Sequence, residues 1–232
     1  MSSPFFKRLV YWFAPHGLVK RYEFWRHKID AKRIYSAYRL PERELVEIFP
    51  GIERQVVGLT PGSFFRPPTM VLPLAELLTL MAICQHKSFQ KAFEIGTFSG
   101  ESTQAIALST PPESRVSTLD IQAYEPGLAF AGRSEAGKIE VLIGDSRHFD
   151  FSAYAGQCDF VYIDGNHTYP FVKSDTEIAL RLLKPGGVIL WDDYIFDPAH
   201  PDCSGVKQAL EELSLPRLYR IKGTRFAVHC SQ

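Results

Sequence analysis

The sequence has no long apolar run and few cysteines. None of its apolar runs approaches the roughly 18 to 20 residues that a membrane-spanning helix needs. The first residues, MSSPFFKRLVYWFAPHG, lack the apolar core and the small-residue cleavage site of a signal peptide. We therefore expect a cytoplasmic protein. The scattered cysteines, without a CxxC pair or a histidine at zinc-finger spacing, argue against a disulfide framework and a structural zinc: Cys84, Cys158, Cys203 and Cys230.

The chain also lacks an excess of charge of either sign, because 26 basic side chains balance 26 acidic ones among 232 residues. A general nucleic-acid binder would carry a large positive excess, so we expect no nucleic-acid partner. With 45% hydrophobic and 13% aromatic residues, the composition is that of a folded chain. No internal repeat is present, and the length suits one compact domain with extra elements.

The N-terminal forty residues differ in charge from the rest. They carry nine basic and two acidic residues, an excess of seven positive charges that the remaining chain balances. A stripe of apolar and aromatic residues at helical spacing begins after Pro15 and Gly17: Leu18, Tyr22, Trp25 and Ile29. The pattern predicts a basic amphipathic helix. Such a helix suits peripheral contact of residues 1–40 with the inner face of an anionic membrane, or packing on the following domain or on a second copy of the chain.

Residues 69–232 alternate between strand-like and helix-like segments, whereas residues 41–68, rich in proline and glycine, are typical of an irregular connector that completes an N-terminal part of residues 1–68. The strand-like runs are nearly continuously apolar, as in parallel strands covered on both faces. This alternation predicts a doubly wound, mostly parallel, seven-stranded α/β sheet that ends in an antiparallel hairpin. We expect strands at 92–96, 115–121, 138–143, 158–164, 187–191, 218–222 and 224–230, and helices at 71–86, 99–109, 124–134, 170–183 and 204–213.

The residues that follow the strands carry the chemistry, because ligands bind outside the carboxyl ends of the strands of an open parallel sheet. Gly96 and Gly100 mark a tight strand-to-helix turn where a ligand can approach the backbone closely. Phe98 stands where the dinucleotide-binding pattern GxGxxG has its second glycine and would obstruct a pyrophosphate. Asp120, twenty-six residues after Glu94, can accept hydrogen bonds from both hydroxyls of a ribose. Together these features suit a nucleoside without a pyrophosphate.

The motifs FEIGTFSGEST, TLDIQ, GDS and LLKPGGVILWDDY stand in an order and spacing that resemble the class I S-adenosylmethionine-dependent methyltransferases. The resemblance covers residues 70–232 and implies a Rossmann-like fold with S-adenosylmethionine as cofactor. It also implies three groups of cofactor-binding residues: a methionine end lined by Glu94, Gly96, Phe98, Gly100 and Ser102, a ribose held by Asp120, and an adenine bordered by Asp145 and Ser146.

Three further acids follow two neighbouring strands and are not needed merely to bind the cofactor. Asp164 ends the strand at 158–164, and Asp192 and Asp193 follow the strand at 187–191, so their carboxylates can converge. Such carboxylates repel one another unless neutralised, and oxygen ligands suit a hard divalent cation such as Mg²⁺. The set resembles the metal-dependent, catechol O-methyltransferase-like branch, and the forms IDGNHTY and WDDY are similar to bacterial sugar O-methyltransferases.

The resemblance implies methylation of a hydroxyl on a small-molecule or glycan acceptor. His167, three residues past Asp164, is a candidate base because an imidazole titrates near neutrality. Asp164 itself is the second candidate, and His167 is also compatible with a solvent-exposed loop or cap position. An alternative from a different class is a non-catalytic protein that keeps the cofactor fold and acts as a scaffold or binding partner in a membrane-associated glycan pathway.

Overall fold

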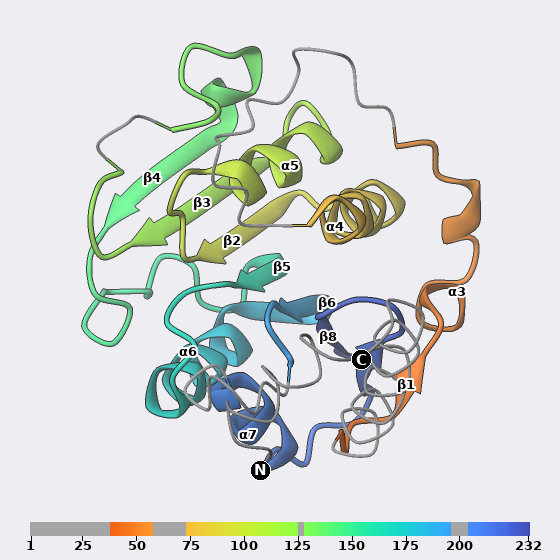
Figure 1. The fold of residues 1–232 in the computed structure, drawn as a ribbon. Coiled ribbons are helices and arrows are strands. Elements are labelled where there is room, and N and C mark those ends of the chain that lie inside the picture. Colours follow the sequence, from red (N-terminus) through yellow and green to blue (C-terminus); the bar gives the residue numbers. More distant parts are fainter. Residues whose placement is uncertain (1–37, 58–72, 125–127, 196–203) are drawn as a thin grey trace, which may run out of the picture. The chain divides into compact units, whose positions relative to one another are not determined.

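The computed structural model of the chain describes residues 38–57, 73–124, 128–195 and 204–232. A compact unit runs from Leu40 to Gln232 (Figure 1). Most of the region expected to form the basic helix lies outside the described residues, as do residues 58–72 of the expected connector and residues 196–203 beyond the acidic pair.

The unit is built on an eight-stranded sheet with the order β1-β7-β8-β6-β5-β2-β3-β4. Strands β2 to β6 run parallel, and β8 runs antiparallel to both β6 and β7. The doubly wound sheet with its antiparallel hairpin is therefore confirmed. The strands are β1 Glu42–Arg43, β2 Lys91–Ile95, β3 Arg115–Asp120, β4 Ile139–Ile143, β5 Cys158–Ile163, β6 Leu183–Trp191, β7 Leu218–Ile221 and β8 Ala227–Cys230.

The sheet has one strand more than the seven expected. The additional strand, β1, lies in residues 41–68, which were expected to form an irregular connector. It pairs in parallel with β7, with Glu42 beside Arg220, and the Glu42 carboxylate lies 2.7 Å from the Arg220 guanidinium. The short helices α3 Leu45–Ile48 and η1 Ile52–Arg54 follow, and Phe49 and Ile52 are buried. A two-residue strand has no periodicity to detect, so sequence patterning could not find it.

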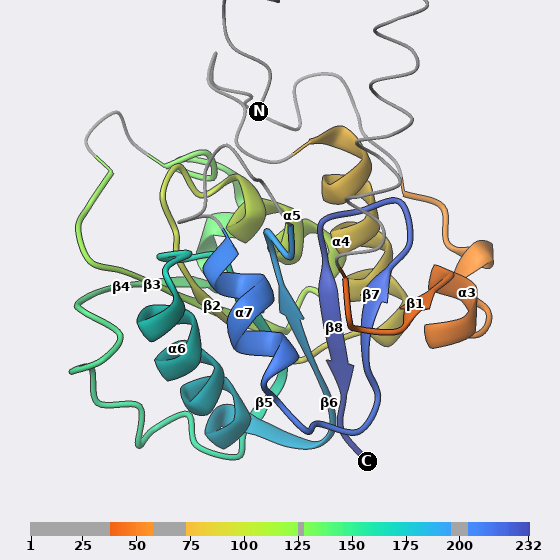
Figure 2. The same cartoon turned by 60° about the horizontal axis from the view of Figure 1, so that its bottom comes forward.

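Two pairs of helices cover the sheet (Figure 2). Helices α4 Leu74–Lys87 and α5 Glu101–Ser109 lie on one face, and α6 Tyr169–Leu182 and α7 Gly205–Glu211 lie on the other. The helix expected near 124–134 is wrong over residues 128–133, which form turns before the 3₁₀ helix η2 Ser134–Lys138. Gly132 at φ +72° explains the break. Within the described ranges, no helix is long and apolar enough to cross a membrane.

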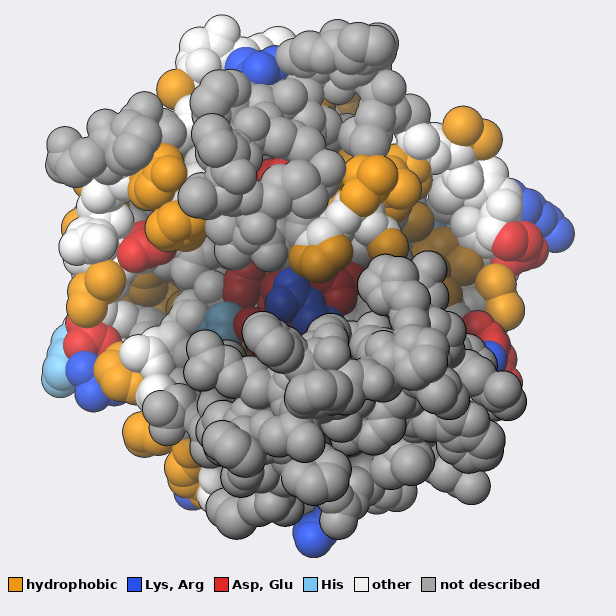
Figure 3. Space-filling model, viewed as in Figure 1, with side chains coloured by type: hydrophobic (Ala, Val, Ile, Leu, Met, Phe, Trp, Pro, Cys, Tyr) orange, Lys and Arg blue, Asp and Glu red, His pale blue; other side chains and the backbone are white. Residues whose placement is uncertain are grey.

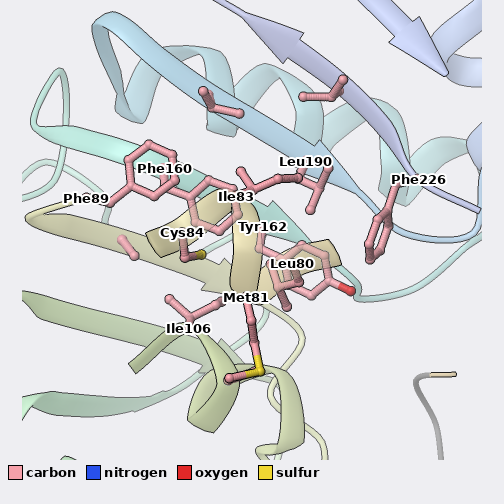
Figure 4. Close-up of a cluster of buried hydrophobic side chains, with 14 of the residues drawn as sticks. Leu80, Met81, Ile83, Cys84, Phe89, Ile106, Phe160, Tyr162, Leu190 and Phe226 are labelled. Atoms are coloured by element: carbon pink, nitrogen blue, oxygen red, sulfur yellow. The ribbon is translucent and has the colours of Figure 1, made fainter. Parts of the chain in front are cut away.

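The core lies between the sheet and α4, where side chains of β5 and β6 meet those of the helix (Figure 4). Every residue of β5 is buried, as the continuous apolar run predicts. Phe160 of β5 stacks on Phe89 with ring centroids 4.7 Å apart, and Tyr162 packs edge-on to Phe226. This core fixes β2 and β5 side by side, and these two strands carry the loops described next.

Candidate functional site

A cavity of about 470 Å³ opens at the carboxyl ends of β2 to β5. It brings together most of the expected site residues, as the position of ligands in open parallel sheets requires. Four expected residues, Glu94, Gly100, Asp192 and Asp193, are not part of its lining. The lining includes these expected residues: Gly96, Phe98, Ser102, Asp120, Asp145, Ser146, Asp164 and His167.

Gly96 sits where the ends of β2 and β5 come closest. Its φ of +103° is a conformation that glycine adopts most readily, and a Cβ at this position would lie 2.1 Å from the Asp164 carbonyl oxygen. The backbone N–H of Asp164 donates to the Ile95 carbonyl at 2.9 Å, which keeps the two strand ends together. The glycine therefore lets Asp164 reach the cavity beside the turn after β2.

Asp120 at the end of β3 organises that turn. Its Oδ2 accepts hydrogen bonds from the backbone N–H groups of Thr97 at 2.9 Å and Phe98 at 2.8 Å. Its Oδ1 has only a long contact, 3.4 Å, from the Gln122 N–H. Phe98 has a positive φ of 42° and is 51% exposed, with its ring 4.9 Å from that of Tyr124. Asp120 thus shapes the loop through one oxygen, and its other oxygen can accept a further hydrogen bond.

Glu94 is fully buried behind the cavity wall. Its carboxylate accepts hydrogen bonds from the hydroxyls of Ser102 at 2.5 Å, Thr118 at 2.6 Å, and Thr103. Burial raises the pKa of Glu94 to about 7, although the three hydroxyls favour its ionised form. The residue ties the first turn of α5 to β2 and β3, and Ser102 lies between it and the cavity lining.

Arg147 pairs with Asp145 at the far wall of the cavity. The guanidinium contacts both carboxylate oxygens, at 3.1 and 2.7 Å, and these hydrogen bonds lower the pKa of Asp145. Arg147 also lies over the Phe171 ring, 4.0 Å from its centroid. Ser146 donates to Asp175 at 2.6 Å, and burial raises the pKa of Asp175 to about 6.

The cavity lining also includes residues that were absent from the sequence prediction, among them Ile121, Phe171 and Asp175. Ile121 is 65% exposed and directly follows Asp120, so its place in the sequence could have predicted that it lines the cavity. Phe171 and Asp175 lie four residues apart on α6 and therefore on one helical face. Only the tertiary fold shows that this face turns toward the cavity.

Asp164, His167 and Asp193 form a hydrogen-bonded chain at the ends of β5 and β6. His167 Nε2 lies 3.3 Å from Asp164 Oδ1, and Nδ1 lies 2.9 Å from Asp193 Oδ2. These bonds to Asp164 and Asp193 raise the pKa of His167 to about 10. In this arrangement the imidazole of His167 is positively charged at neutral pH. The sequence predicted instead a group that titrates near neutrality.

Arg225, in the connection between β7 and β8, lies on the other side of the acidic pair and was missed by sequence reasoning. Its Nη1 lies 2.5 Å from Asp193 Oδ1, and its Nη2 lies 3.6 Å from Asp192 Oδ2. Its Nε lies 3.1 Å from each carboxylate oxygen of Glu76, in the first turn of α4. No local motif marks this arginine. Acidic, basic and histidine side chains gather in a hollow near the centre of the face in Figure 3.

The three carboxyl groups of the cluster differ in the direction of their pKa shifts. Burial, followed by the charges of Asp164 and Asp193, raises the pKa of Asp192 to about 8. Burial also raises the pKa of Asp164, against the hydrogen bond from His167. The pKa of Asp193 is lowered because His167 and Arg225 stabilise its ionised form more than burial opposes it.

The donor atoms of this cluster fit a hard divalent cation. Asp164, Asp192 and Asp193 offer carboxylate oxygens, and a cation would relieve their mutual repulsion. In the part of the chain that the structure describes, no three acidic, histidine or cysteine side chains already form a metal-binding group. His167 and Arg225 both contact Asp193, so cation binding at this carboxylate requires an exchange of partners.

Comparison with known proteins agrees with this geometry. Residues 93–194 match the family described as "Methyltransferase domain". This segment is similar in sequence to a methyltransferase domain. This domain spans the turn after β2, Asp120, the exit of β4, Asp164 and the Asp192–Asp193 pair.

The chain is similar in sequence to caffeoyl-CoA and catechol O-methyltransferases. It is 32% identical over 115 residues to a caffeoyl-CoA O-methyltransferase of Stellaria longipes, covering 46% of this chain and 47% of the relative. It is 30% identical over 109 residues to a catechol O-methyltransferase of Mycobacterium tuberculosis, covering 46% of this chain and 49% of the relative. The chain thus spans about half the length of these two relatives.

Solved structures share the fold of the methyltransferase domain. The O-methyltransferase TomG of Streptomyces achromogenes, solved in complex with S-adenosylmethionine, superposes with a TM-score of 0.58 at 22% identity, covering 85% of this chain and 94% of that chain. An O-methyltransferase of Bacillus cereus in complex with SAH gives a TM-score of 0.57 at 22% identity, covering 71% and 84%. At this identity the likeness supports the fold of the domain.

Proposed function

We propose that the chain is an S-adenosylmethionine-dependent O-methyltransferase that uses a divalent cation and methylates a hydroxyl of a sugar or glycoside. The observation that carries the proposal is the adjacency of two sites at neighbouring strand ends. A cavity with Asp120 on its wall reaches Asp164 and His167, which connect directly to the Asp192–Asp193 pair. A methyl donor and an activated hydroxyl must meet at such a junction.

The cavity residues suit the three parts of the cofactor. Oδ1 of Asp120 accepts from the ribose hydroxyls, while Gly96 allows the backbone to approach the methionine end. The exposed side chain of Ile121 offers an apolar surface to the adenine, and Asp145 and Ser146 border it. Glu94 acts from behind the wall by holding Ser102.

The acidic cluster suits activation of the acceptor. Asp164, Asp192 and Asp193 would hold the cation, which lowers the energy of an alkoxide when it binds the acceptor oxygen. His167 accepts the hydroxyl proton in its neutral form, after releasing to solvent the proton that Asp164 and Asp193 stabilise, with Asp164 as the second candidate base. Both groups lie on the cavity wall, next to where the methyl donor is placed.

A phenolic acceptor is the second candidate, favoured by the names of the relatives. These include caffeoyl-CoA, catechol and flavonoid O-methyltransferases. The sugar class is favoured by the IDGNHTY and WDDY forms of the acidic motifs. Both classes can offer two neighbouring oxygens, so a panel of glycosides and catechols under the same conditions distinguishes them.

The first test is calorimetric titration of the full chain with S-adenosylmethionine, with and without Mg²⁺. We expect binding to the wild type, and binding within about threefold of it by the Asp192→Asn, Asp193→Asn double variant, because neither residue lines the cavity. The same variant should lose Mg²⁺-dependent methyl transfer to the acceptor panel. A wild type that binds no cofactor would refute the proposal and favour the scaffold alternative.

Replacing His167 tests the proton acceptor. We expect His167→Ala to lower the turnover of methyl transfer by at least about 100-fold, the usual scale of general base catalysis. The KM for S-adenosylmethionine should change less than turnover does, because the imidazole lines the cavity but its hydrogen bonds go to Asp164 and Asp193. A pH profile of turnover that keeps the wild-type shape in the variant would assign the base to Asp164 instead.

A further inference from the structure

Arg225 is held in the acidic cluster by more contacts than a surface arginine would make. Its backbone N–H donates to Glu76 Oε1 at 2.8 Å, in addition to the contacts of its Nε with the same carboxylate. Glu76 is only 4% exposed, and it lies 149 residues away in the sequence. The arginine is therefore placed by the tertiary fold, with its two terminal nitrogens directed at Asp192 and Asp193.

These terminal nitrogens contact oxygens that a divalent cation would need. Nη1 contacts Oδ1 of Asp193, whose other oxygen contacts His167, and Nη2 contacts Oδ2 of Asp192. The second oxygen of Asp192 accepts the Asp193 N–H at 2.7 Å. Each of the four carboxylate oxygens of Asp192 and Asp193 therefore contacts a hydrogen-bond donor or a cationic group of the chain.

The guanidinium is a permanent competitor, because it does not lose its proton in proteins. A positive charge a few ångströms from a metal ligand opposes cation binding, because like charges repel at short range. The Glu76 carboxylate accepts hydrogen bonds from both Nε and the backbone N–H of Arg225, so the opposition does not disappear by simple rotation of a free side chain.

We propose that Arg225 is a positioning residue that competes with the divalent cation for the Asp192–Asp193 pair and thereby sets the cation affinity of the site. The inference rests on the proposed cation site. It adds a residue outside the matched methyltransferase domain, which ends at Tyr194. Arg225 holds the two carboxylates together, and it yields them when the cation binds.

Titration of the full chain with Mn²⁺, followed by electron paramagnetic resonance of the free ion, tests the competition without any acceptor. We expect Arg225→Gln to bind Mn²⁺ at least about tenfold more tightly than the wild type. Arg225→Lys keeps the charge but loses the planar fork, so its affinity should lie between the two. Lys222→Gln is the matched control, because it removes one positive charge from the same hairpin at a side chain that pairs with Glu44.

Unchanged or weaker Mn²⁺ binding by Arg225→Gln would overturn the inference, as would equal tightening in Lys222→Gln. Circular dichroism of each variant shows whether it is folded, and Arg225→Lys carries the test if Arg225→Gln is not. A wild type that binds no Mn²⁺ while Arg225→Gln does would support the competition and count against the cation in the proposed function. Failure to bind S-adenosylmethionine would refute the proposed function and leave the Mn²⁺ result to decide the competition.

Discussion

Gly96→Ala is expected to lower the free energy of unfolding by about 4 kcal/mol, which is a large part of the stability of an ordinary domain. The added Cβ would lie 2.1 Å from the carbonyl oxygen of Asp164 and 2.5 Å from its carbonyl carbon. These are backbone atoms, so the clash cannot be relieved by turning a side chain. The ends of β2 and β5 must separate, which breaks the hydrogen bond between Ile95 and Asp164.

Urea denaturation of Gly96→Ala and Gly186→Ala measures the clash apart from backbone strain. Gly186 also has a positive φ, +76°, but a Cβ there would meet nothing within 4 Å. We expect Gly186→Ala to cost only about 1 kcal/mol, the strain of a left-handed alanine. Equal losses in the two variants would contradict the close approach of β2 and β5. Because Asp164 shifts with the clash, Gly96→Ala should also lose binding of S-adenosylmethionine.

The parallel core of the sheet was predictable from the sequence because its strands are buried on both faces. The run at 158–164 is nearly continuously apolar, and β5 is buried at every position. Boundaries were harder to place. Helix α5 begins at Glu101, two residues later than expected, because Gly100 in a left-handed conformation still belongs to the turn. Strand β6 begins at Leu183, directly after α6 and four residues before the expected start at residue 187.

The acids of the site were predictable because strand exits meet at one edge of the sheet. That rule brings Asp120 and Asp164 into one cavity lining. It could not predict the Glu76–Arg225 pair, since one residue comes from α4 and the other from the β7–β8 connection. Nor could it predict that His167 would lie between two carboxylates and remain protonated. Such side-chain partnerships are properties of the tertiary fold.

Glu94→Gln is expected to remove a pH dependence of stability worth about 3 kcal/mol. Burial raises the pKa of Glu94 from 4.5 to about 7, so the folded state holds this proton more tightly than the unfolded chain does. The stability linked to that proton is fully present below pH 4.5, and it is lost as the pH rises through about 7. Glutamine has no proton to lose, so the variant should gain stability relative to the wild type across this range.

The measurement is the difference in unfolding free energy between Glu94→Gln and the wild type, from urea denaturation at several pH values between 4.5 and 8. Taking the difference cancels other groups that titrate in this range, such as Asp175. Thr103→Val is the control, because it removes a hydroxyl that favours the ionised carboxylate but leaves the carboxylate in place. The pH dependence should then persist and move to higher pH. If the difference does not change with pH, Glu94 has the same pKa in the folded and unfolded chains. That result would contradict the burial of its carboxylate among the hydroxyls of Ser102, Thr103 and Thr118.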